Sequence, residues 1–154
     1  MIEIKDETEK VILVGVALSD QDDTKESLEE LKDLVSTAGA ETAGMLIQNR
    51  EQHPATYVGK GKIEELKNMI WELRATGIVC DDELSPAQMK NLQDELDVKV
   101  MDRTLIILDI FAARASTSEG KIQVELAQLK YRASRLIGLG NSLSRLGGGI
   151  GTRG

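Results

Sequence analysis

Aromatic side chains, cysteine and histidine are scarce in this sequence, and each scarcity narrows what the protein can be. Aromatics make up 3% of the 154 residues, so aliphatic side chains must fill the core and we expect no aromatic platform for stacking bases. The single cysteine, Cys80, cannot form an internal disulfide and suits a reducing compartment. The single histidine, His53, has no cysteine cluster, so neither a metal site nor a Ser-His-Asp system is supported.

Long apolar runs are also missing. No stretch approaches the roughly 20 residues that a membrane-spanning helix needs. The first ten residues, MIEIKDETEK, carry charges where a signal peptide would be apolar. With 41% hydrophobic and 29% charged residues in about one domain's length, we expect a globular protein of the cytoplasm.

The net charge of −7 hides an asymmetry along the chain. From Arg114 onward there are seven basic and two acidic residues, whereas residues 1–113 hold 12 basic and 24 acidic ones. An acidic first part joined to a basic last part indicates that the last part meets a polyanion.

Strand and helix patterns alternate four times over the first 115 residues. Ser85, Pro86 and Gln88 form a strong helix start, and Asp23 with Glu26 suggests a second capping box. Glycines 39 and 77 are expected to end the first two helices. The expected strands are 11–18, 43–49, 78–81 and 98–102, and the expected helices are 23–38, 62–76, 86–96 and 104–115. This alternation predicts an α/β fold with a small parallel four-stranded sheet flanked by helices.

The remainder, 116–154, has a different pattern and is expected to form a helical arm separate from the α/β domain of residues 1–115. In the helix expected at 118–137, aliphatic residues recur at spacings of four, three, four and three, which is a heptad seam. Its members are Ile122, Leu126, Leu129, Ala133 and Leu136. The last 17 residues hold seven of the fourteen glycines. We therefore expect the first helix of an antiparallel hairpin, or coiled coil, followed by a glycine-rich tip loop at 138–154 whose partner helix is absent.

Four long stretches carry a resemblance to a known family. They are YVGKGKIEEL (57–66), DDELSPAQMKNLQDEL (81–96), DRTLIILDIFAARASTSEGKIQVELAQLKY (102–131) and LSRLGGGIGTRG (143–154). In these stretches the sequence resembles the N-terminal, ribosome-binding region of the HflX family, translational GTPases that bind the large (50S) ribosomal subunit. Residues 1–56 share only the family's strand–helix–strand pattern.

The resemblance implies an α/β domain, a two-helix coiled coil and then a GTPase domain, in a factor that splits or rescues stalled ribosomes under stress. The chain has no GTPase domain, so we expect no GTP hydrolysis from it, and GTP and Mg²⁺ are expected only in the missing domain. The partners implied are the large ribosomal subunit with its rRNA, and the missing helix and GTPase domain in cis. Self-association through the unpartnered seam is a further outcome.

The strongest candidate site is the tip loop. Glycines let a backbone approach RNA closely, and arginines bind phosphates or stack on bases. The expected rRNA-binding residues there are Arg145, Gly147, Gly148, Gly149 and Arg153. A solvated flexible linker is the alternative. On the preceding helix, Lys121 and Arg135 are the preferred basic residues, although solubility alone explains most exposed cations.

Two further groups of residues allow a competing function, a small ATP- or GTP-binding α/β enzyme. Residues Gly59, Lys60, Gly61 and Lys62 lack the Walker A spacing but could form an anion-binding turn at a helix start. The acidic run 81–83 follows a strand and could hold Mg²⁺, yet a solvated loop clamped by Asp102 and Arg103 is the simpler explanation. No nucleophile is paired with a base, so no catalytic residue is predicted, and Cys80 is expected to be inert packing.

Overall fold

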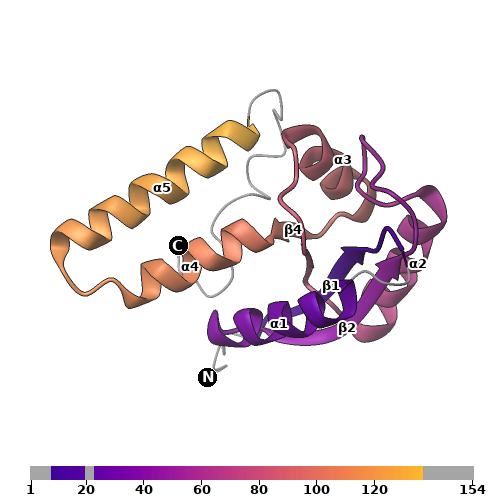
Figure 1. Cartoon of the computed structure of the whole chain (residues 1–154), viewed down its shortest axis with the longest axis horizontal. Helices are drawn as coiled ribbons and strands as arrows, with labels where there is room; N and C mark the ends of the chain where they lie inside the picture. The colour runs from indigo at the N-terminus through magenta and orange to yellow at the C-terminus, as the bar shows by residue number, and fades with distance from the viewer. Residues whose placement is uncertain (1–7, 20–22, 137–154) are drawn as a thin grey trace, which may run out of the picture.

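The computed structural model describes residues 8–19 and 23–136 as one α/β unit from which a pair of helices projects (Figure 1). Four strands alternate with four helices, and a fifth helix follows. In chain order they are β1 (Lys10–Val16), α1 (Thr24–Thr37), β2 (Glu41–Gln48), α2 (Lys60–Leu73), β3 (Gly77–Cys80), α3 (Pro86–Leu96), β4 (Lys99–Asp102), α4 (Arg103–Arg114) and α5 (Ser118–Leu136). The α/β prediction is confirmed.

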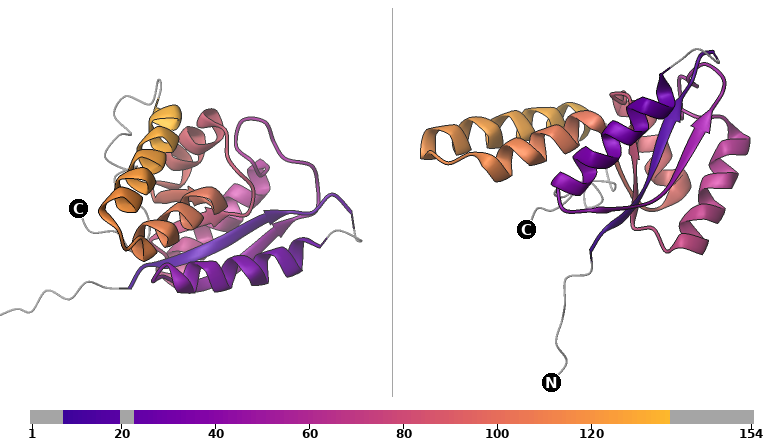
Figure 2. Two further views of the ribbon diagram at one scale, coloured as in Figure 1. Left: turned by 60° about the vertical axis from the view of Figure 1, so that its left-hand side comes forward. Right: turned by 60° about the horizontal axis from the view of Figure 1, so that its bottom comes forward.

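All strand pairs are parallel, and the sheet order is β2-β1-β3-β4. The central strand β1 is buried over Val11–Val14, as its continuous apolar run predicted. Helices α1 and α4 contact each other on one face, and α2 and α3 contact each other on the other face (Figure 2). Because α1 leads from β1 outward to β2 while α3 leads from β3 outward to β4, the connections diverge between β1 and β3.

The helix ends predicted from local sequence signals are confirmed in some cases and wrong in others. The capping box of α3 is present: Ser85 Oγ accepts from the Gln88 amide, and the Gln88 side chain accepts from the Ser85 amide. At α1 the capping-box prediction is wrong, since Asp23 occupies the cap position but makes no side-chain capping hydrogen bond. Gly39 follows α1 with φ of +96°, which suits glycine.

Helix α2 does not end at Gly77, contrary to expectation. It ends at Leu73, and Arg74 takes the left-handed conformation (φ 55°) at the cap. Gly77 instead starts β3, where an added Cβ would lie 2.7 Å from the carbonyl oxygen of Lys99 on β4. This glycine is required by close strand packing rather than by helix termination.

Helices α4 and α5 lie side by side and extend away from the sheet, as Figure 1 and the right view of Figure 2 show. Helix α5 contacts both α4 and α3. Within residues 8–19 and 23–136, no helix is both long and apolar enough to cross a membrane.

Candidate functional site

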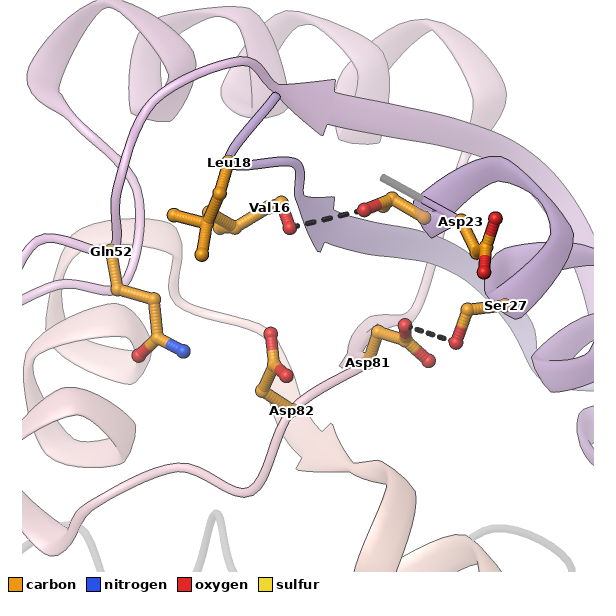
Figure 3. A pocket seen from close by; sticks show the side chains of 8 residues that line it. Val16, Leu18, Asp23, Ser27, Gln52, Asp81 and Asp82 are labelled. Carbon is orange, nitrogen blue, oxygen red and sulfur yellow. Dashed lines mark hydrogen bonds between the residues drawn. The ribbon is translucent and has the colours of Figure 1, made fainter. Parts of the chain in front are cut away.

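A cavity of about 340 Å³ opens at the carboxyl end of the sheet between β1 and β3 (Figure 3). This is the switch point of the sheet, where α/β proteins commonly bind ligands. Its lining comes from the end of β1, the start of α1, the loop after β3 and Gln52. The lining residues are Val16, Leu18, Asp23, Thr24, Ser27, Gln52, Asp81 and Asp82.

The carboxylates of this cavity are partly committed to the fold. Asp81 accepts a hydrogen bond from Ser27 Oγ at 2.6 Å and forms an ion pair with Arg103 at 2.7 Å. Asp82 accepts a hydrogen bond at 2.5 Å from the hydroxyl of Tyr57, which is fully buried and whose pKa burial raises. The predicted clamp by Arg103 is therefore present.

The cavity's charge does not favour a nucleotide. Its described lining has three carboxylates and no lysine or arginine, so a phosphate would meet like charge. Among the described residues no group of three or more His, Cys, Asp or Glu could hold a metal ion, so Mg²⁺ at residues 81–83 has no support there. Cys80 is buried and burial raises the pKa of its thiol, which fits packing.

The turn Gly59–Lys62 forms the start of α2, two residues earlier than expected. The amide of Gly59 already donates to Gln48 Oε1 at 2.6 Å, so this amide is not free for a ligand. A separate cavity of about 260 Å³ lies beside it, with Arg50 and Lys60 in its lining. Anion binding by Gly59, Lys60, Gly61 and Lys62 stays a prediction.

Asp102 anchors helix α5 instead of pairing with the acidic loop. Its buried carboxylate accepts from the amides of Leu84 (2.9 Å) and Leu105 (3.1 Å) and from the hydroxyl of Tyr131 on α5. Burial raises the pKa of Asp102, and these hydrogen bonds offset the rise in part. The expectation that Asp102 clamps residues 81–83 through its side chain is thus wrong, because the carboxylate is occupied by backbone donors and Tyr131.

A second buried carboxylate holds the middle of α5. Asp109 of α4 accepts from Gln128 Nε2 at 2.9 Å, and its carboxylate lies 3.7 Å from the guanidinium of Arg132. Burial raises the pKa of Asp109 to about 6, against the opposing charge of Arg132 and the hydrogen bond from Gln128. Helix α5 therefore turns a polar face toward α4. We call the contacts of Asp109 with Gln128 and Arg132, together with the contact of Asp102 with Tyr131, the arm clamp.

Arg135 also belongs to the arm clamp. Its guanidinium lies 3.7 Å from the centre of the Tyr131 ring, donates to the Leu84 carbonyl at 3.1 Å and pairs with Glu83 at 3.3 Å. Only 12% of its side chain is exposed. RNA binding by Arg135 is therefore not favoured by its position, because these contacts would have to break. Lys121 is exposed, and RNA binding by it stays a prediction.

The aliphatic side chains of the heptad seam are exposed, although burial would favour the reverse. Ile122, Leu126 and Leu129 are 65%, 49% and 63% exposed, while Gln128 is buried. The seam has no covering helix among the described residues. The tip-loop residues Arg145, Gly147, Gly148, Gly149 and Arg153 lie outside the described part of the chain.

Several residues of this region were missed from the sequence. Asp109 sits inside the apolar run LIILDIF, and Tyr131 and Gln128 fall between seam positions, so no local pattern marked them. An ionisable residue within an apolar helix was the one available signal, since buried carboxylates are rare unless paired.

Comparison with known proteins agrees with the fold. Residues 25–112 match the family described as GTP-binding GTPase N-terminal, and residues 114–154 match the GTP-binding GTPase Middle Region. The chain is 68% identical to the GTPase HflX of Lacrimispora saccharolytica over its whole length and 43% identical to that of Escherichia coli, covering 37% and 36% of those proteins. It thus spans little more than a third of these relatives.

Solved structures show the same likeness. The crystal structure of SsGBP with GDP superposes with a TM-score of 0.68 at 27% identity, over 84% of this chain and 37% of that one. A GTP-binding protein of Sulfolobus solfataricus in complex with GDP, at 24% identity, shares the fold with a TM-score of 0.66, over 90% of this chain and 41% of that one. The chain belongs to the HflX family of GTP-binding proteins, whose N-terminal and middle regions it matches.

Proposed function

We propose that this chain is the ribosome-binding part of a cytoplasmic HflX protein, which places its helical arm on the large ribosomal subunit. The observation that carries the proposal is the exposed seam of α5. Each large aliphatic side chain left in water forgoes about 1.5–3 kcal/mol of burial, so a row of three indicates a missing partner helix. We infer that a second helix completes a hairpin, and that residues 138–154 belong to its tip.

The arm clamp supports a role in positioning. Hydrogen bonds from Tyr131 and Gln128 to two buried carboxylates fix the direction of α5 relative to the sheet. A rigid arm delivers its tip to one place on a large partner at a lower entropic cost than a flexible arm. The basic excess from Arg114 onward suits an RNA target, with Arg145 and Arg153 as phosphate contacts.

In the whole protein, we infer that GTP and Mg²⁺ bind a separate GTPase domain and that the arm takes part in splitting or rescuing stalled ribosomes. The relatives' name, GTPase HflX, supports the hydrolytic activity of those proteins. Hydrolysis is not assigned to this chain, because the GKGK turn lacks the spacing that cradles phosphates.

Co-sedimentation with purified 50S subunits tests the proposal. The chain should pellet with 50S at low salt, and binding should fall with salt with a log–log slope of about −0.7 to −0.9 for each phosphate contact. Replacing Arg145 and Arg153 by alanine should weaken binding and flatten the slope. The matched control removes two exposed cations from α1, Lys25→Ala with Lys32→Ala, and should bind normally.

Failure of the intact, folded chain to pellet with 50S at low salt would remove the proposal. Self-association through the seam is a separate outcome: Leu126→Lys should abolish a seam dimer seen by sedimentation velocity while leaving the tip loop unchanged. Binding to 50S that persists in this variant would confirm that the seam itself is not the RNA contact.

A further inference from the structure

The only tryptophan of the chain, Trp71, stands on the surface of α2 with 84% of its area exposed. Leaving so large an apolar ring in water is costly, and exposed tryptophans are enriched where proteins bind partners. The rarity of aromatic residues predicts no platform for stacking bases, yet this one ring is open to solvent.

Trp71 borders a cavity of about 640 Å³ at the end of α2. The remaining described lining comes from Ile70, Glu72, Arg74 and Ala75. Ile70 and Ala75 are wholly or partly buried and provide an apolar floor, while Arg74 is exposed. A flat apolar ring beside an apolar floor and a guanidinium suits a ligand that is aromatic at one end and anionic at the other.

A second cavity of about 340 Å³ adjoins the first through Arg74 and adds another cation. Its lining consists of Thr8, Lys10, Arg74 and Thr76. Thr76 fixes Lys10 by two hydrogen bonds to its backbone, so the start of β1 holds this lysine beside the turn. No acidic partner of the Arg74 or Lys10 side chain occurs within the described residues, and Glu72 is the one carboxylate in the described part of either lining.

The backbone of Arg74 is held by the end of α2. It caps the helix in the left-handed conformation, with its amide donating to the Ile70 carbonyl, as Asp97 does at the end of α3. The guanidinium therefore starts from a backbone position that the helix end defines.

We propose that Trp71, Arg74 and Lys10 form a second RNA contact, in which an unpaired base stacks on Trp71 and its phosphates bind Arg74 and Lys10. Bases splayed out of single-stranded RNA are recognised by stacking on aromatic rings, and arginine and lysine neutralise the adjacent phosphates. The two cations beside the ring favour an anionic ligand, and single-stranded RNA offers a base and its phosphates together.

This proposal rests on the proposed function, because it gives a ribosome-bound chain a second RNA contact away from the arm. It lies at the amino end of the strands, whereas the switch-point cavity lies at their carboxyl end. The arm and this surface would then hold RNA at two places, which would fix the orientation of the α/β domain.

Because Trp71 is the only tryptophan, its fluorescence reports this surface alone. Titration of the chain with a single-stranded adenylate RNA hexamer at low salt should quench the fluorescence in a saturable way. Arg74→Gly suits the left-handed backbone, so the fold is kept; it should weaken binding several-fold and lower the log–log salt slope by about 0.7. Arg74→Lys should restore the slope, and Lys32→Ala on α1 is the matched control and should change nothing.

Anisotropy of a labelled hexamer tests the ring itself. Trp71→Ala should weaken binding about ten-fold and Trp71→Phe much less, because stacking needs an aromatic face. The double variant Arg145→Ala, Arg153→Ala should leave the Trp71 quench unchanged even if 50S binding is lost, which separates this site from the tip loop.

Three results would overturn the proposal: no saturable quench from the folded chain, a quench that polyglutamate produces equally well, or a quench that Lys32→Ala reduces as much as Arg74→Gly. The second would point to an acidic protein segment as the partner. None of these results decides whether the tip loop binds 50S, because co-sedimentation measures that binding separately.

Discussion

Replacing Asp109 by asparagine is expected to stabilise the folded chain at neutral pH. The carboxylate is 2% exposed, between α4 and α5, and its pKa is raised by burial from 3.8 to about 6. Arg132, Gln128 and Lys99 favour the ionised form but offset only part of the cost of burial. The folded state thus binds a proton more tightly than the unfolded state does.

The sign of the effect follows from this difference. Between about pH 4 and 6 the folded chain holds a proton on Asp109 that the unfolded chain has lost, so stability falls as pH rises through this window and is flat above it. A pKa raised from 3.8 to about 6 corresponds to at most about 3 kcal/mol, and we expect a penalty of about 1–3 kcal/mol for the ionised form. Asparagine removes the charge and keeps an oxygen that can accept from Gln128.

Urea unfolding followed by circular dichroism, at several pH values, measures the effect. At pH 7.5 Asp109→Asn should raise the free energy of unfolding by about 1–3 kcal/mol, and the gain should shrink below pH 6 and vanish near pH 4. Asp33→Asn, at an exposed position on α1, is the control and should change stability by less than about 0.5 kcal/mol at any of these pH values. A loss of stability in Asp109→Asn at pH 7.5 would refute the reasoning, since it would mean that the ion pair with Arg132 outweighs burial.

Three further experiments test the packing. Tyr131→Phe leaves Asp102 without its donor from α5, so it should cost about 1–3 kcal/mol and speed hydrogen exchange in α5; unchanged exchange would contradict the arm clamp. In denaturant unfolding, Leu129→Ala should cost less than about 0.5 kcal/mol because the side chain is exposed, whereas Leu92→Ala in the core should cost about 2–5 kcal/mol; equal costs would mean that the seam is covered. Gly77→Ala should lower the melting temperature because its Cβ would collide with the Lys99 carbonyl, while Gly61→Ala, in open space on α2, should raise it slightly; the reverse order would show that the strand packing differs.

Part of the fold was predictable from short patterns in the sequence. The buried run of β1, the Ser85 capping box and the alternation of strands and helices each depend on residues within about four positions of one another, and the structure confirms them. Other local predictions failed, including one in which a contact with a distant segment overrides the local signal. Gly77 looked like a helix stop, but the contact with Lys99 in a neighbouring strand decides its role.

The candidate site was less predictable because its key contacts join distant segments. Tyr131 reaches Asp102 across 29 positions, and Arg135 reaches Leu84 across 51. The seam could be recognised from its spacing, and its exposure agrees with a missing partner. The face that α5 does bury could not be recognised, because Gln128 and Tyr131 are polar enough to suit solvent when only their neighbours in sequence are considered.

Residue type and spacing are enough to establish the α/β class, the two-part charge distribution and the apolar row on the last helix. The sheet order, the direction of α5 and the exposure of Trp71 follow only from how the folded chain packs. The physical reason is that a buried carboxylate such as Asp102 or Asp109 is tolerated only where donors from other segments meet it, and which segments meet is fixed only when the whole chain packs.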